Sequence, residues 1–439
     1  MIWPDPTTLP GISPHQQGAL AQVFSGPVGI LTGGPGTGKT RTAAAALRAL
    51  IDSLGASSVA VCAPTGKAAV RIMAELSKCG LSHPATTIHR LLGVQRNGHD
   101  GKGWGFRHDA GNPLPYRVVA IEEASMADTD LSANLLSACA PGTHLLVIGD
   151  TGQLPPVGHG APLRDWIAAG LPHGELTETW RNGGDIVRAC AAIRAGKPFR
   201  PSEYIDIEAG KNWLHVEARP AAVAGVVERI VSTLPAGIDP LWDVQVSCAV
   251  NEKGDCSRLA LNKLLQGVLN PAGEKIQGTD FRLRDKVICT SNCMLPVSES
   301  GTFEPVSECA SDFVANGEIG QVIAADKGVL LVQFTSPARV VQAVGEFREA
   351  FELAYAVTTH KSQGSQWPVV IAVIDHSRSA DGVCSNEWWF TALSRMERLC
   401  VTIGPLETLR GHCLRRVLPK RKTFLREKLM GLEWPKEGM

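Results

Sequence analysis

The chain has 439 residues, a length that divides into roughly three structural units at about 150 residues per domain. Its 43 lysines and arginines equal its 43 aspartates and glutamates, so composition excludes a broad basic field, and any polyanion must be held by a local cluster. Hydrophobic residues form 44% of the chain, yet no apolar run approaches the roughly 18 residues of a membrane span. We therefore expect a globular protein without a membrane partner.

The amino terminus and the cysteines predict the compartment. The first ten residues hold three prolines and an aspartate but no basic residue, unlike a secretory signal. Of the 12 cysteines, Cys289 and Cys293 form a close pair, and no second close pair completes a tetrahedral zinc site. We expect a cytoplasmic protein with reduced thiols.

Short β-rich runs alternate with stretches rich in alanine and leucine, a pattern typical of α/β folds with parallel sheets. The expected strands lie at 28–32, 59–63, 117–121 and 145–149 in a first set, and at 245–249, 353–357, 369–374 and 399–403 in a second set. Residues 281–344 interrupt the second set. They hold short β segments broken by glycine and polar residues, as in a small antiparallel barrel.

A glycine-rich segment follows the first expected strand and opens an alanine-rich helix. Residues 33–40 read Gly-Gly-Pro-Gly-Thr-Gly-Lys-Thr and match the phosphate-binding loop in its required strand-to-helix context. Residues without a Cβ let successive backbone N–H groups surround phosphate oxygens, while Lys39 adds a charge and Thr40 a Mg²⁺ ligand. The expected nucleotide contacts are Gly33, Gly34, Gly36, Thr37, Gly38, Lys39 and Thr40.

Two acids end a second apolar strand. Four apolar residues, 118–121, precede Glu122 and Glu123. We expect Glu122 to hold Mg²⁺ through water, and Glu123 to orient and deprotonate an attacking water.

Eight further motifs lie in order along the chain. They occupy residues 12–16, 63–69, 87–92, 149–158, 176–181, 316–320, 360–365 and 391–395. Their order and spacing resemble those of the RecD-like branch of superfamily 1 DNA helicases, which includes the phage helicase Dda. The resemblance covers about residues 12–430.

The resemblance implies ATP and Mg²⁺ as cofactors and assigns roles to individual residues. Gln16 would read adenine, Gln153 would sense the γ-phosphate, and Arg41 and Gly364 would contact the nucleotide. Arg181 and Arg395 would be arginine fingers on the second lobe, which is consistent with the need for cations around the transferred phosphoryl group. Trp180 would either stack on adenine or anchor its neighbour in the core.

Two positions depart from the family pattern. Glu122 stands where the family usually has aspartate, which lengthens the metal-side carboxylate by one methylene and leaves a water-mediated Mg²⁺ contact feasible. Gln366 stands where a glutamate is usual, so one nucleotide contact loses its charge.

The resemblance also implies a groove for single-stranded DNA over the carboxyl ends of both sheets. The expected contacts are Pro64, Thr65, Lys67 and His89 on the first lobe, and His360, Lys361, Ser362 and Gln363 on the second. Such contacts go to phosphates and hydroxyls, so binding should be insensitive to base sequence.

Residues 94–106 contain an Asn-Gly turn signal and aromatic residues among glycines. Relatives carry a strand-splitting hairpin here. Trp104 or Phe106 would support such a pin, with a surface loop as the alternative.

The carboxyl-terminal stretch 405–439 holds nine basic residues against four glutamates. A basic helix here would contact duplex phosphate or a partner. A terminal segment packed by its leucines is the more common outcome.

The implied architecture is two RecA-like P-loop NTPase domains with an inserted β-hairpin (pin) and a small SH3-like β-barrel. The expected boundaries are 1–170 for the first domain, with the hairpin at 94–116, then 171–278 and 351–439 for the second, with the barrel at 279–350. The implied activity is that of a monomeric ATP-dependent helicase on single-stranded and forked DNA, moving 5′ to 3′. The alternatives are a nucleotide- and DNA-binding scaffold without efficient hydrolysis, a 3′ to 5′ helicase and a small-molecule kinase.

Overall fold

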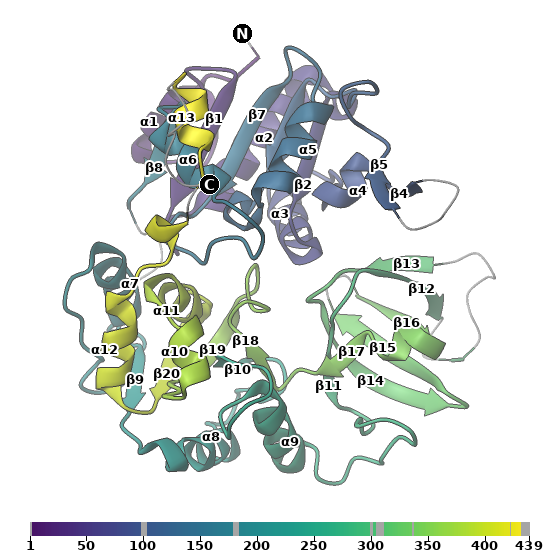
Figure 1. The fold of residues 1–439 in the computed structure, drawn as a ribbon, viewed down its shortest axis with the longest axis vertical. Helices are drawn as coiled ribbons and strands as arrows, with labels where there is room; N and C mark the ends of the chain where they lie inside the picture. The colour runs from purple at the N-terminus through teal and green to yellow at the C-terminus, as the bar shows by residue number, and fades with distance from the viewer. Residues whose placement is uncertain are drawn as a thin grey trace. The chain divides into compact units, whose positions relative to one another are not determined.

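The fold contains three large β-sheets and a short β-hairpin (Figure 1). The computed structural model describes residues 2–97, 103–178, 184–298, 302–303, 311–335, 338–421 and 423–431. By compactness the chain divides into two units. The first is Met1–Gly183 with Arg416–Met439, and the second is Gly184–Arg415. Among the described residues, no helix is both long and apolar enough to cross a membrane.

The first unit is built on a six-stranded parallel sheet in the order β3-β2-β6-β7-β1-β8. Its strands are β1 (Val28–Gly33), β2 (Val59–Ala63), β3 (Ala85–Thr87), β6 (Val118–Ile121), β7 (His144–Gly149) and β8 (His173–Leu176). Four of them confirm expected strands to within one residue at each end. The short strands β3 and β8, at the two edges of the sheet, were not expected.

Helices cover both faces of this sheet because both faces of its strands are apolar. Neighbouring residues of β1 enter different cores, since Leu31 packs with Leu47 of α2 and Ile30 packs with Leu163 of α6. The helices are α1 (Pro14–Val23), α2 (Lys39–Leu54), α3 (Gly66–Lys78), α4 (Ile88–Leu92), α5 (Thr129–Ala138), α6 (Pro162–Ala168) and α13 (Leu425–Leu429).

The first unit is larger than expected at both of its ends. Strand β8 pairs with β1, so the predicted boundary at residue 170 lies too early. The end of the chain also returns to this unit, where α13 packs against α6 (Figure 1) and Thr423 Oγ1 donates to Asp165 Oδ2 at 2.8 Å. Residues 416–431 therefore do not belong to the second domain, to which the sequence interpretation assigned them.

The second unit contains a five-stranded parallel sheet in the order β18-β10-β19-β20-β9. Its strands are β9 (Trp213–Val216), β10 (Val244–Cys248), β18 (Ala356–Thr358), β19 (Trp367–Val373) and β20 (Met396–Ile403). The helices of this unit are α7 (Gly184–Ala195), α8 (Val223–Ser232), α9 (Arg258–Leu269), α10 (Arg378–Val383), α11 (Asn386–Leu393) and α12 (Leu406–Leu414).

The same unit carries a seven-stranded antiparallel sheet in the order β13-β12-β16-β15-β14-β11-β17. Its strands are β11 (Lys286–Cys289), β12 (Cys293–Ser298), β13 (Ser311–Val314), β14 (Ile319–Asp326), β15 (Val329–Thr335), β16 (Ala338–Val344) and β17 (Phe351–Leu353). The expected strand at 353–357 was wrong. The chain changes sheets there, because β17 pairs antiparallel with β11 whereas β18 pairs parallel with β10.

A two-stranded antiparallel hairpin, β4 (Val94–Asn97) with β5 (Gly103–Phe106), follows α4. Its register pairs Val94 with Phe106 and Asn97 with Gly103. The turn at 98–102 and the side chain of Trp104 lie outside the described part of the chain.

Candidate nucleotide site and the neighbouring strand ends

The glycine-rich loop between β1 and α2 takes a backbone path that glycine permits. Gly36 (φ 76°) and Gly38 (φ 79°) have left-handed backbone conformations, and Gly38 is the N-cap residue directly before α2. A Cβ on Gly33 would lie 2.6 Å from Thr37 Oγ1. The Lys39 ammonium donates to the Gly33 carbonyl at 2.7 Å, so its charge lies over the loop. The loop therefore forms a backbone cradle suited to phosphate.

The two acids at the end of β6 lie beside the start of α2. Thr40 Oγ1 donates to Glu122 Oε1 at 2.8 Å, across 82 residues of sequence. Glu122 is 1% exposed and Glu123 is 4% exposed. The structure thus brings together the threonine and the carboxylate that the sequence assigned to Mg²⁺.

The surroundings of these acids suit a cation. Burial, followed by the charge of Glu123, raises the pKa of Glu122 to about 7, while Arg71, Lys39 and the Thr40 hydrogen bond oppose the rise. Glu122 Oε2 and Glu123 Oε2 are buried and have no hydrogen-bond partner among the described residues. Buried carboxylate oxygens without donors carry a large desolvation cost, which a hydrated Mg²⁺ with a nucleotide phosphate would offset. The residues present therefore fit a magnesium nucleotide.

Glu123 carries a feature that the sequence interpretation missed. Its backbone is left-handed (φ 51°), which is uncommon for a residue with a side chain. Arg71 Nη1, on α3, lies 3.6 Å from Glu123 Oε1. The sequence does show that Arg71 lies one helical turn after Lys67, a predicted DNA contact. Nothing in the local sequence indicates that Arg71 pairs with Glu123.

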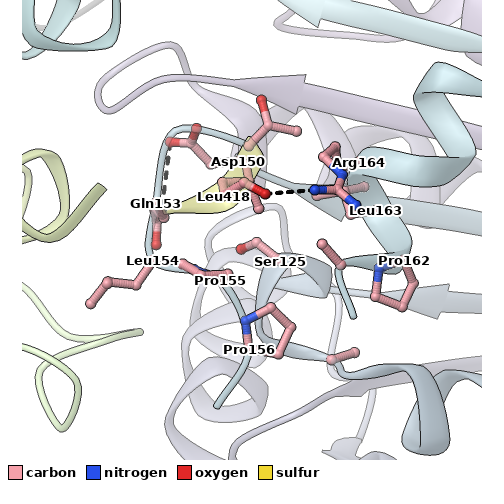
Figure 2. A pocket seen from close by; sticks show the side chains of 13 residues that line it. Ser125, Asp150, Gln153, Leu154, Pro155, Pro156, Pro162, Leu163, Arg164 and Leu418 are labelled. Atoms are coloured by element: carbon pink, nitrogen blue, oxygen red, sulfur yellow. Dashed lines mark hydrogen bonds between the residues drawn. The ribbon is translucent and has the colours of Figure 1, made fainter. Parts of the chain in front are cut away.

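Asp150 and Gln153 lie in the loop that follows β7, the strand beside β6. Asp150 Oδ1 accepts from the Gly152 amide at 2.9 Å, and Gln153 Nε2 lies 3.5 Å from Asp150 Oδ2. Gln153 Oε1 is buried without a partner among the described residues. Figure 2 shows both residues among the side chains that line a pocket within the first unit, together with residues of the loop that follows β7, the start of α6 and Leu418.

Gln16 and Arg41 belong to the two helices α1 and α2. The Gln16 side chain completes a capping box with Ser13 by accepting from the Ser13 amide at 3.0 Å, and its Nε2 lies 3.5 Å from the Thr37 carbonyl oxygen. Arg41 is exposed in the first turn of α2. Gln16 is therefore linked to the phosphate-binding loop, although its own helix cap already uses its amide oxygen.

The expected DNA contacts of the first unit follow strand ends of its sheet. Pro64 and Thr65 follow β2, and Thr65 Oγ1 caps α3 by accepting from the Ala68 amide. Lys67 lies in the first turn of α3. His89 lies on α4, with its ring 6.1 Å from the Phe106 ring at the base of the β4–β5 hairpin. The structure thus places His89 beside the hairpin.

In the second unit the expected DNA contacts differ in exposure. Ser362 is 1% exposed and donates to the Thr359 carbonyl, and Gln363 is 6% exposed. These two side chains are buried within the unit, and their contact with DNA stays a prediction. His360 and Lys361 are half-buried, and Lys361 Nζ forms an ion pair with Glu352 at 2.8 Å. Gly364 follows with a left-handed backbone (φ 77°).

Of the two expected arginine fingers, Arg395 lies among the described residues. Arg395 is 3% exposed, its Nε donates to the Thr391 carbonyl at 3.1 Å, and its Nη2 donates to Ser394 Oγ at 3.0 Å. Its guanidinium is therefore held by its own unit. Arg181 and Trp180 lie outside the described residues.

Known protein families match two separate stretches of the chain. A family model described as an AAA domain matches residues 11–219, and a model of the UvrD-like helicase C-terminal domain matches residues 353–403. The ATP-dependent RecD2 DNA helicase of Deinococcus radiodurans is 32% identical over 392 residues, which cover 88% of this chain and 48% of that protein. The chain thus spans about half of the length of this relative.

Two further matches extend the comparison. The RecBCD enzyme subunit RecD of Mycolicibacterium smegmatis is 28% identical, over 97% of this chain and 77% of that protein. Among solved structures, a Pif1 helicase studied at forked double-stranded DNA overlaps with a TM-score of 0.49 at 18% identity, over 89% of this chain and 92% of that one. An overlap that loose does not bear on function. The sequence matches thus show that the chain is similar to RecD2 and RecD proteins over most of its own length.

Proposed function

We propose that the chain is an ATP-dependent DNA helicase that moves 5′ to 3′ along single-stranded DNA and unwinds duplex DNA. The observation that carries the proposal is the contact between Thr40 and Glu122, at 2.8 Å, beside a second buried acid, Glu123. A phosphate-binding loop alone is common to many nucleotide-using proteins. A hydrolase also needs a carboxylate that orients water, and Glu123 supplies one here.

The residues divide the chemistry among them. The loop amides and Lys39 would bind the phosphates, and Thr40 and Glu122 would hold Mg²⁺, which would neutralise charge on the phosphates. Glu123 accepts the proton of the attacking water, and Gln153 orients toward the terminal phosphate. Gln16, Arg41 and Gly364 contribute to nucleotide binding.

Arg181 and Arg395 are the proposed arginine fingers. Arginine fingers supply about 10³ to 10⁵ in rate by placing positive charge on the transferred group. Because Arg395 belongs to the second unit and the phosphate-binding loop to the first, hydrolysis would depend on both units. In this proposal, closure on ATP and reopening after hydrolysis would shift the grip on a DNA strand and produce movement.

The finer architecture belongs to the same proposal. The β4–β5 hairpin would act as the strand-splitting pin, and the antiparallel sheet of the second unit would be the SH3-like barrel. Single-stranded and forked DNA would contact Pro64, Thr65, Lys67 and His89 on the first unit, with His360 and Lys361 on the second. We propose a monomer.

Phosphate release with and without single-stranded DNA tests the proposal. A helicase should hydrolyse ATP faster when an oligothymidylate is added, and Glu123→Gln should abolish the turnover. A small-molecule kinase would show no response to the oligonucleotide. A non-hydrolysing scaffold would bind ATP and DNA without releasing phosphate.

A further inference from the structure

Helix α3 connects the proposed DNA-contact loop to the proposed catalytic base. The helix begins at Gly66, directly after Pro64 and Thr65, and its first turn contains Lys67. Arg71 lies one turn further along, on the same side of the helix as Lys67, because side chains four residues apart share a face. Its Nη1 lies 3.6 Å from Glu123 Oε1.

Helix α3 is a continuous helix of 13 residues. Its buried residues include Ala68, Ile72 and Leu76, and the last two belong to the core beneath the sheet. Thr65 caps its amino end. A displacement of residues 64–67 would therefore also move Arg71, because only one helical turn, about 5 Å along the axis, separates Arg71 from residue 67.

The contact between Arg71 and Glu123 is adjustable. At 3.6 Å the two groups form an ion pair, but the separation exceeds that of a normal hydrogen bond. The Arg71 side chain is 30% exposed, whereas that of Glu123 is 5% exposed, so the arginine has the greater freedom to move. Glu123 Oε2 has no partner among the described residues. The carboxylate is thus held at one oxygen by a loose contact.

The charges around Arg71 fit this role. Glu122 and Glu123 face it from the end of β6, and Lys39 is the other cation that acts on Glu122. Glu75, one turn further along α3, is instead paired with Lys78 at 2.6 Å. Arg71 is therefore directed at the buried acids.

We propose that Arg71 is a positioning residue that couples the binding of a DNA strand at residues 64–67 to the orientation of the Glu123 carboxylate. A DNA strand bound at the amino end of α3 shifts the helix. The contact between the Arg71 guanidinium and Glu123 Oε1 then shortens to a hydrogen bond. This leaves Oε2 directed at the attacking water. Without bound DNA, the Glu123 carboxylate keeps only its longer contact with Arg71, and ATP hydrolysis is slow. The inference rests on the proposed helicase function and extends it by naming the residue that carries the signal.

Steady-state ATP hydrolysis, measured with and without oligothymidylate, tests this role in the full chain. Arg71→Ala should lower the DNA-stimulated kcat by about tenfold or more, because a small misplacement of a catalytic group can cost about 10²-fold. The rate without DNA should fall much less, and the KM for ATP and the Kd for the oligonucleotide should change by less than about threefold. Arg71→Lys should restore part of the stimulation.

Two controls separate coupling from a general effect of charge or folding. Lys78→Ala removes an exposed cation from the same helix and should leave the stimulation intact. Because Glu123→Gln abolishes turnover, Arg71→Ala is added to it as a binding control and should change the Kd for ATP and for the oligonucleotide by less than about threefold, since the arginine acts through that carboxylate. If Arg71→Ala does not fold, Arg71→Gln and Arg71→Lys provide the same comparison.

The outcomes are distinct. Equal loss of the basal and stimulated rates in the Arg71 variants, or full stimulation in all of them, overturns the coupling role. Absence of DNA stimulation in the unaltered chain overturns the proposed function itself, whatever the Arg71 variants do.

Discussion

Thr40 and Glu122 share a hydrogen bond of 2.8 Å although 82 residues separate them in the sequence. The contact joins the start of α2 to the end of β6. Because parallel strands end at one edge of a sheet, it gathers the phosphate-binding loop and two buried acids in one place.

Lys39→Ala should weaken nucleotide binding and abolish turnover. The Lys39 ammonium lies over the loop, 2.7 Å from the Gly33 carbonyl oxygen, where it would meet phosphate. Loss of a charged hydrogen bond costs about 1.5–3 kcal/mol, which corresponds to about a 10- to 150-fold higher Kd. Titration with a fluorescent ATP analogue measures this, with Lys78→Ala as the matched lysine control. Parent-like hydrolysis by Lys39→Ala would contradict the assignment.

Binding of MgATP should release a proton from Glu122. Burial raises the pKa of this carboxyl to about 7, so it is partly protonated near pH 6.5, and a nearby Mg²⁺ lowers its pKa and expels the proton. Calorimetric titrations in buffers of different ionisation enthalpy count the protons released. We expect a release of up to about one proton with MgATP near pH 6.5, little release above about pH 8.5, and less release for ATP with a chelator. Equal release by Glu122→Gln would show that another group is responsible.

Replacing Trp104 and Phe106 together by alanine should reduce the base pairs opened per ATP. Phe106 lies beside His89 at the base of the hairpin, and an aromatic wedge there would replace stacking worth about 1–3 kcal/mol per base. Strand displacement divided by phosphate release gives the coupling. Tyr204→Ala, which removes an exposed aromatic residue from the second unit, is the control. Unchanged coupling in the double variant would exclude the pin.

Arg164→Ala should loosen the end of the chain. Arg164 donates from Nη1 to the Leu418 carbonyl at 2.5 Å and from Nη2 to the Arg421 carbonyl at 3.1 Å, and Figure 2 shows the first of these bonds. Loss of such bonds costs about 1–3 kcal/mol, so amide hydrogen exchange in residues 416–431 should become about ten- to a hundredfold faster. Arg188→Ala, at an exposed ion pair of α7, should leave that exchange unchanged. Equal exchange in both variants would mean that other contacts hold the segment.

Local patterns predicted the parts of the fold that local chemistry decides. The phosphate-binding loop, the acids after β6 and the long strands carry their own signals, in glycine spacing and apolar runs. Edge strands do not. β8 has four residues, His173–Leu176, and its place beside β1 depends on pairing with a distant strand rather than on its own sequence.

The site was predicted less completely than the fold. Ser362 and Gln363 belong to a recognisable motif, but burial depends on how β18 packs, which a motif does not reveal. The pairing of Arg71 with Glu123 joins two segments that are far apart in sequence. The docking of residues 416–431 on the first unit likewise arises from tertiary contacts such as that of Thr423 with Asp165.

Strand displacement on forked DNA with a single tail tests the central claim most directly. With ATP and Mg²⁺, the chain should displace a strand from the substrate with a 5′ tail and not from the one with a 3′ tail, and Glu123→Gln should displace neither while still binding ATP. Displacement by Glu123→Gln at the parent rate, or no displacement by the unaltered chain from either fork, would contradict an ATP-driven helicase. Displacement from the 3′-tailed fork alone would reverse the proposed direction.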